Sequence, residues 1–129
     1  MGEIPRAQTP AEQRMTFSFR RFTSTQKFTH QKCKDSTAYL NQLLERMKAV
    51  SGMETGPFRA SGGSALRSHQ IKFEETSERN GFGFAIPEGC SPWQFSLSSN
   101  EYGRVHGYII RNVFYVVWLD PEHALYPQR

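Results

Sequence analysis

The feature that most constrains the fold is a set of three apolar runs between residues 92 and 126, separated by short polar segments. The first run, Trp93 to Ser98, alternates large apolar side chains with polar ones, which is typical of a strand with one buried face. The second run extends from Arg104 to Ile110, and the third, Val113 to Leu119, is apolar on both faces. This pattern predicts a three-stranded antiparallel meander whose central, doubly covered strand is Val113 to Leu119.

Two short segments predict where these strands end. Arg111-Asn112 separates the second and third runs and suits a two-residue hairpin in which Asn112 takes a positive φ. Asp120-Pro121 should end the third strand, because proline has no N–H to donate to a neighbouring strand. The residues that follow, 122 to 126, are therefore expected beside the end of the most buried strand.

One helix is predicted upstream of the meander, from Ser36 to Ser51. Asp35-Ser36-Thr37 offers side chains that can cap its first turn, and Gly52 is a suitable C-terminal stop. Its apolar stripe is formed by Tyr39 or Leu40 together with Leu43, Leu44, Met47 and Val50. The residues expected to face outward are Lys34, Gln42, Arg46 and Lys48.

The remaining segments complete a fold of the α+β class, with one main helix packed on a twisted antiparallel sheet of about four strands. Residues 1–15 are mostly polar, carry two prolines and show no periodicity, which predicts a mobile N-terminal extension to a single domain of residues 16–129. The other expected elements are a short edge strand or an irregular packed segment near Phe17 to Phe22, a short helix within Met53 to Ala60, a strand at Ile71 to Thr76 and a long loop at Ser77 to Ser91.

Composition limits the class of protein. With 129 residues and 37% hydrophobic content, the chain can bury the core of one domain without disulfides. It has neither an apolar run long enough to cross a membrane nor a segment like a signal peptide, so a cytoplasmic location is expected. The net charge is +4, and eleven of the sixteen basic residues are arginine, which favours phosphate contact but selects nucleic acid only weakly.

The sequence contains no catalytic or metal-binding motif of high specificity, and it indicates no cofactor. A metal site built from His69, His106, Asp120 and His123 remains an alternative, although no two histidines have the i, i+4 spacing of ligands on one helix face. On the strand from Arg104 to Ile110, alternation places Arg104, His106, Tyr108 and Ile110 on one face. Three explanations are open: Arg104 and His106 lie on a solvent-facing surface, His106 is a satisfied, partly buried histidine, or the face is a concave basic surface that receives RNA.

The order of an N-terminal strand or arm, a helix and then the meander resembles the RelE/ParE superfamily of small basic toxins. The similarity covers about Asp35 to Tyr126 and includes an aromatic-polar strand leading to an arginine-containing strand, Pro92 to Ile110. His123 and Tyr126 follow the last strand, as a catalytic histidine and tyrosine do in some mRNA-cleaving members. The short second helix, the long Ser77 to Ser91 loop and the Asp120-Pro121 stop depart from the superfamily pattern.

The resemblance implies cleavage of an RNA phosphodiester by its own 2′-hydroxyl group. This reaction needs a base, an acid and donors for the phosphoryl oxygens. The base is expected to be His123 or Glu122, and His106 or Tyr126 is expected to be the acid or a base-stacking residue. The residues expected to bind RNA phosphate are Arg67, Arg104 and Arg111. The implied partners are RNA or the ribosome and a cognate antitoxin that covers the basic face.

Two other interpretations stay open. The residues after Asp120 could simply cap the end of the sheet, with the ring of Tyr126 packed beneath it. The same face could also belong to a non-enzymatic binding module of a mobile element or phage that binds protein or nucleic acid. A toxin should arrest growth when it is expressed alone, whereas a binding module should be tolerated.

Overall fold

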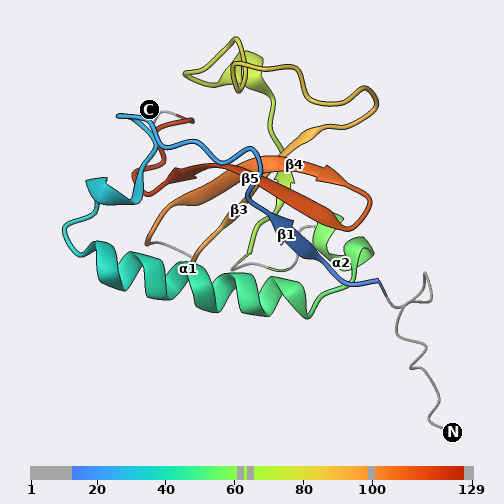
Figure 1. Cartoon of the computed structure of the whole chain (residues 1–129), viewed down its shortest axis with the longest axis horizontal. Helices are drawn as coiled ribbons and strands as arrows, with labels where there is room; N and C mark the ends of the chain where they lie inside the picture. Colours follow the sequence, from blue (N-terminus) through green and yellow to red (C-terminus); the bar gives the residue numbers. More distant parts are fainter. Residues whose placement is uncertain (1–12, 61–62, 64–65, 99–100, 127–129) are drawn as a thin grey trace, which may run out of the picture.

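A five-stranded mixed sheet with one long helix across one face forms the centre of the computed structural model, which describes residues 13–60, 63, 66–98 and 101–126 (Figure 1). The strands lie in the order β1-β5-β4-β3-β2. Their bounds are β1 Thr16–Ser18, β2 His69–Gln70, β3 Pro92–Ser96, β4 Arg104–Ile110 and β5 Val113–Asp120. The helices are α1 Ser36–Ser51 and α2 Thr55–Arg59, with short 3₁₀ turns η2 at His30–Lys32 and η3 at Phe73–Glu75. The α+β class is confirmed.

The antiparallel meander is confirmed, but its predicted centre is wrong. β3 pairs with β4 and β4 pairs with β5, both antiparallel, so β4 is the middle strand of the meander and of the whole sheet. β5 ends at Asp120, directly before Pro121, as predicted. In the β4–β5 hairpin the positive φ belongs to Arg111 (56°) rather than Asn112. The Asn112 side chain instead donates to the carbonyl oxygen of Arg14.

The expectation of an all-antiparallel sheet of about four strands is also wrong, because β1 pairs with β5 in parallel. The predicted edge strand near Phe17 is therefore present, but only as Thr16–Ser18. The packed chain begins before it, since Met15 is fully buried and its N–H donates to the carbonyl oxygen of Met53 at 2.8 Å. Of the predicted mobile extension, residues 1–12 lie outside the described part of the chain.

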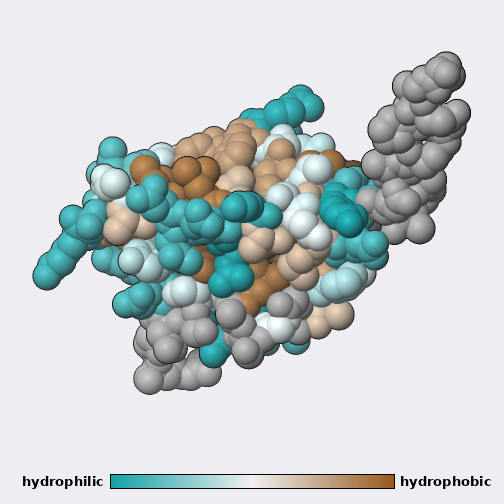
Figure 2. Space-filling view, turned by 90° about the horizontal axis from the view of Figure 1, so that it is seen from below, coloured by the Kyte–Doolittle hydropathy of each residue, from teal (hydrophilic) through white to brown (hydrophobic). Residues whose placement is uncertain are grey.

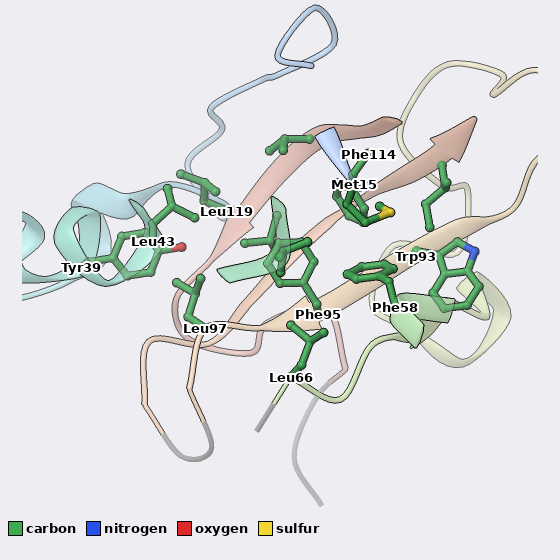
Figure 3. Packing of buried hydrophobic residues seen from close by; sticks show 14 residues of the cluster. Met15, Tyr39, Leu43, Phe58, Leu66, Trp93, Phe95, Leu97, Phe114 and Leu119 are labelled. Atoms are coloured by element: carbon green, nitrogen blue, oxygen red, sulfur yellow. The ribbon is translucent and has the colours of Figure 1, made fainter. Parts of the chain in front are cut away.

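The helix α1 has the predicted bounds and covers one face of the sheet (Figure 1). The Asp35 carboxylate accepts from the Ala38 N–H at 2.9 Å and caps the first turn. Figure 3 shows the cluster that α1 closes, which consists mainly of aromatic and aliphatic side chains from α1, α2 and one face of the sheet. Labelled members include Met15, Tyr39, Leu43, Phe58, Leu66, Trp93, Phe95, Leu97, Phe114 and Leu119.

The buried stripe of α1 is narrower than predicted. Leu40 and Leu44 are 37% and 62% exposed, and Figure 2, which looks onto the α1 side, shows apolar areas among hydrophilic side chains. Gln42 and Arg46 do not face outward, because both donate to the carbonyl oxygen of Leu97 just beyond β3. The helix is thus attached to the sheet partly through hydrogen bonds that satisfy a backbone group where β3 ends.

The second face of the sheet is covered by irregular chain rather than by a helix. The long loop at 77–91 is confirmed, and it supplies Phe82 to a second cluster that also contains Phe28, Ile71, Tyr108, Val117, Trp118 and Leu125. The predicted strand Ile71 to Thr76 is wrong: β2 ends at Gln70 and the chain then turns through η3. Phe73 in that turn packs edge-on against Phe82 at 5.0 Å between ring centroids, a loop contact that alternation cannot reveal.

A β-bulge in β5 directs side chains toward the second face. The register shifts by one residue between the pairs His106–Trp118 and Gly107–Val116, so Val117 is an extra residue in β5. Both Val117 and Trp118 consequently join the second cluster. Within the described residues, no helix combines the length and the apolar character needed to span a membrane.

Candidate functional site

A cleft of about 350 Å³ lies on the second face of the sheet, where β2 to β5 meet the turn after Asp120. Its walls carry histidine, arginine, lysine, carboxylate, amide and tyrosine side chains rather than aliphatic ones. The lining residues are His69, Gln70, Lys72, Glu75, Gln94, Arg104, His106, Asp120, His123 and Tyr126. Register explains this gathering: His69 pairs with Gln94, Gln94 with His106, and Arg104 with Asp120, each on neighbouring strands.

The deepest part of the cleft is a buried pair, His106 and Asp120. The His106 Nε2 donates to Asp120 Oδ2 at 2.8 Å, and both side chains are almost completely buried. The same carboxylate accepts from the Ala124 N–H at 2.7 Å and from the Leu125 N–H at 3.0 Å. Asp120 therefore holds the turn that carries His123 into position.

The charge states of this pair follow from burial and hydrogen bonding. Burial lowers the pKa of His106, and this outweighs the opposite effect of its bond to Asp120. Burial alone would raise the pKa of Asp120, but hydrogen bonds from His106 and the two backbone N–H groups lower it overall. The pair is thus a neutral imidazole that donates to a carboxylate, and it suits a positioning role.

Arg104 and His123 form the second contact, closer to the cleft opening. The Arg104 guanidinium donates to His123 Nε2 at 3.3 Å and to the Gly103 carbonyl oxygen at 3.3 Å. Burial and then the charge of Arg104 lower the pKa of His123, which keeps this imidazole neutral and able to accept a proton. Among the described residues, no carboxylate forms an ion pair with Arg104.

Arg104 therefore carries a half-buried positive charge that no ion pair among the described residues neutralises. Burial and the nearby charge of Arg67 lower its pKa, so both effects oppose the charged form. Asp120 is close enough to act on it favourably, but the Asp120 oxygens are already engaged by His106 and by the backbone. A bound anion would supply the negative charge that the described residues do not place beside Arg104.

The opposite wall is formed by His69, Gln94 and Tyr126. His69 Nδ1 lies 2.8 Å from the Gln70 carbonyl oxygen, and its Nε2 lies 3.0 Å from Gln94 Nε2. The Tyr126 hydroxyl accepts from the Lys72 N–H at 2.9 Å, which leaves its own proton available for donation. The ring of Tyr126 lies 6.2 Å from that of His69.

The structure brings together some of the sequence-predicted site residues but not all. Arg104, His106, His123 and Tyr126 line the cleft. Glu122 does not: it is exposed and pairs with Lys32 at 3.5 Å in a separate hollow. Arg111 lies exposed beyond the far end of β4, roughly 20 Å from Arg104 along the strand. Arg67 is exposed and is not a lining residue, yet it acts electrostatically on Arg104 and His123.

Several lining residues had no predicted role in acid, base or phosphate chemistry. They are His69, Gln70, Lys72, Glu75, Gln94 and Asp120. Gln94 can be recognised in the sequence as a polar residue between Trp93 and Phe95. Alternation alone predicts that such a residue faces solvent, because the sequence does not show that the second face of the sheet is covered. No group of three histidine, cysteine or acidic side chains within the described ranges is placed to hold a metal ion, so the alternative metal site gains no support.

Comparisons with protein-family models, with curated proteins and with solved structures found no match for this chain.

Proposed function

We propose that this cleft binds and cleaves RNA, and that the protein is a toxin of the RelE/ParE-like kind. The observation that carries the proposal is Arg104, a half-buried guanidinium without a carboxylate partner in the described residues, next to a neutral histidine in a polar cleft. Arginine suits phosphate because its planar fork can donate two parallel hydrogen bonds. A cleft of about 350 Å³ is of the size that holds a small ligand or one nucleotide of a chain.

The proposed reaction needs no water. The 2′-oxygen attacks the adjacent phosphorus while His123 Nε2 takes the hydroxyl proton, and the bond from phosphorus to the 5′-oxygen breaks. Phosphate binding draws the Arg104 guanidinium away from Nε2, so the ligand itself frees the base. The Tyr126 hydroxyl donates its proton to the departing 5′-oxygen, and the products are a cyclic 2′,3′-phosphate and a free 5′-hydroxyl.

Within this proposal the other residues have indirect roles. His106 is completely buried and bonded to Asp120, so it positions the turn of His123 instead of exchanging protons with RNA.

The net charge of +4 supports attraction to RNA or the ribosome, and an acidic antitoxin segment that covers Arg104 would neutralise the protein. The five-stranded mixed sheet differs from the sheet that the toxin resemblance led us to expect. The proposal therefore rests on the cleft rather than on the fold.

The test is cleavage of a labelled single-stranded RNA by the purified chain, beside induced expression in a bacterial host. The wild type should produce cyclic phosphate ends and arrest growth with loss of mRNA. Arg104→Gln and His123→Gln should each lower the cleavage rate at least about 100-fold, because each removes a group used in the transition state. Arg111→Gln, the matched loss of a remote exposed arginine, should retain activity.

The second candidate is a non-enzymatic binding module that uses the same cleft. It is favoured by the hydrogen bond from Arg104 to His123 Nε2. Catalysis would have to break this bond to free the base, whereas a site that only binds its ligand would not. The same assay separates the two functions. RNA that is bound through Arg104 but stays intact, together with normal growth, would support the binding module and contradict the toxin.

A further inference from the structure

Two buried acceptor atoms on residues that line the cleft have no hydrogen-bond partner among the described residues. They are Oε1 of Gln94 and Nδ1 of His106, on side chains that are 3% and 0% exposed. Each unsatisfied buried acceptor costs free energy, and such atoms in a native cleft call for an explanation. Their residues are direct partners across β3 and β4, so their side chains start about 5 Å apart on the same face.

The hydrogen-bond network fixes both atoms as acceptors. His69 Nδ1 faces a carbonyl oxygen and must carry its proton, so His69 Nε2 accepts, and the Gln94 atom beside it must be the amide nitrogen. The free atom of Gln94 is then its carbonyl oxygen. His106 donates from Nε2 to Asp120, and burial lowers its pKa, so its free Nδ1 is a lone pair rather than an N–H.

The matching ligand group carries two N–H bonds and no charge. An ammonium group or a metal cation is disfavoured, because Arg104 and Arg67 make the surroundings positive and already oppose a further positive charge on His123. The exocyclic amino group of a nucleobase meets both conditions, since it is neutral and offers two donors.

We propose that Gln94 and His106 recognise the amino group of a nucleobase whose phosphate is bound by Arg104. This inference rests on the proposed function and names its substrate class, RNA with an amino-bearing base at the bound position. Uracil is the disfavoured base, because it presents the O4 acceptor where cytosine presents its N4 amino group. The acceptor atoms of Gln94 and His106 would then face the O4 acceptor of uracil, and no hydrogen bond could form between them.

The experiment is calorimetric titration of the full chain with cytidine 3′-monophosphate, uridine 3′-monophosphate and inorganic phosphate. The wild type should bind the cytidine compound about tenfold more tightly than the uridine compound. Gln94→Met removes the acceptor at similar length and should bring this ratio close to one. Gln31→Met, at an exposed glutamine that does not line the cleft, should keep it.

Equal affinity of the wild type for the two nucleotides would overturn the inference, while phosphate binding and RNA cleavage would still support the proposed function. Failure to bind any of the three ligands, with RNA left intact, would overturn both. Should Gln94→Met not fold, the wild type is titrated with N4,N4-dimethylcytidine 3′-monophosphate, which lacks both N–H bonds. Its affinity should then fall to that of the uridine compound, and an unchanged affinity would refute the recognition.

Discussion

Asp120 joins three parts of the molecule through one carboxylate. It is the last residue of β5, it accepts from His106 on β4, and it accepts from two backbone N–H groups of the following turn. Pro121 ends the strand, but the carboxylate determines the path of the chain afterwards. His123 takes a positive φ of 57° within that turn, a conformation that costs energy for a residue other than glycine. The bonds to Asp120 hold the turn in this form.

Asp120→Ala should therefore lower the free energy of unfolding by about 3–5 kcal/mol, since it leaves His106 and two backbone groups buried without a partner. The measurement is urea denaturation followed by tryptophan fluorescence. Glu122→Ala, which removes the exposed carboxylate of the Lys32 pair, should cost less than about 1 kcal/mol. Equal losses in the two variants would contradict the role given to Asp120.

Stability should fall in mild acid. His106 and His123 have lowered pKa values in the folded state, so below the unfolded histidine pKa of about 6.5 the unfolded chain binds more protons. Their contribution is fully present above that pH and is lost as the pH falls toward their folded pKa values. Asp120, whose pKa is also lowered, adds a similar loss at lower pH.

The measurement is urea denaturation at pH values from 7.5 to 5, chosen around the unfolded histidine pKa of about 6.5. His106→Gln should flatten the decline, whereas Arg111→Gln, which keeps every histidine, should reproduce it. A wild-type stability that is constant or rises in this range would show that the buried imidazoles are not held neutral.

At the scale of the elements, β4 depends on close approach to β5. A Cβ atom built on Gly107 would lie 2.0 Å from the Tyr115 carbonyl oxygen and 2.7 Å from a ring carbon of Phe114. The bulge at Val117 is next to this contact, so the two strands cannot separate there without disturbing the pairing of His106. Glycine at 107 is required by space rather than by φ.

Gly107→Ala should accordingly destabilise the fold by at least about 1–3 kcal/mol, as overpacking does in a filled core. Gly56→Ala is the matched control, because a Cβ atom there has no neighbour within 4 Å in the described part of the chain and Gly56 lies in helix α2. That substitution should be neutral or should stabilise by up to about 1 kcal/mol. Thermal unfolding of both variants provides the comparison, and a harmless Gly107→Ala would disprove the steric requirement.

The regular elements of the fold could be predicted because their signals are local. The Asp35 cap, the apolar stripe and Gly52 predict α1, and Asp120-Pro121 predicts the end of β5. The parallel pairing of β1 could not be predicted, because three residues carry no directional signal and the pairing depends on contacts nearly a hundred residues away. The packing of the loop at 77–91 on the second face of the sheet could not be predicted either, because it also depends on contacts between residues far apart in the sequence.

The candidate site was only partly predictable for the same reason. Alternation on β4 places Arg104 and His106 on one face, and the strand end brings His123 and Tyr126 close to it. Gln94 and His69 enter the cleft through cross-strand register, which the sequence does not contain. Glu122 and Arg111 are near the cleft residues in sequence, but the turn and the strand length direct them elsewhere.

At the scale of the whole molecule, positive charge acts in two ways. Most basic residues add to a diffuse field of net charge +4, while Arg104 is half-buried within a cleft and meets any ligand directly. Under the proposed function, the diffuse part would attract RNA from solution, and salt would screen this attraction. The charge of Arg104 would neutralise one phosphate in the cleft and release its counterion.

Binding of a short single-stranded RNA should therefore weaken with salt, and the slope of log affinity against log salt should become smaller by about 0.7 when one phosphate contact is lost. Arg104→Gln should show this change together with weaker binding at every salt concentration. Arg111→Gln lowers the net charge equally but removes an arginine outside the cleft, so its slope should stay close to that of the wild type. The measurement is fluorescence anisotropy from 50 to 300 mM salt, a range across which phosphate contacts weaken by orders of magnitude. Equal changes of slope in both variants would mean that RNA binding depends on net charge alone, and they would contradict phosphate binding by Arg104 in the cleft.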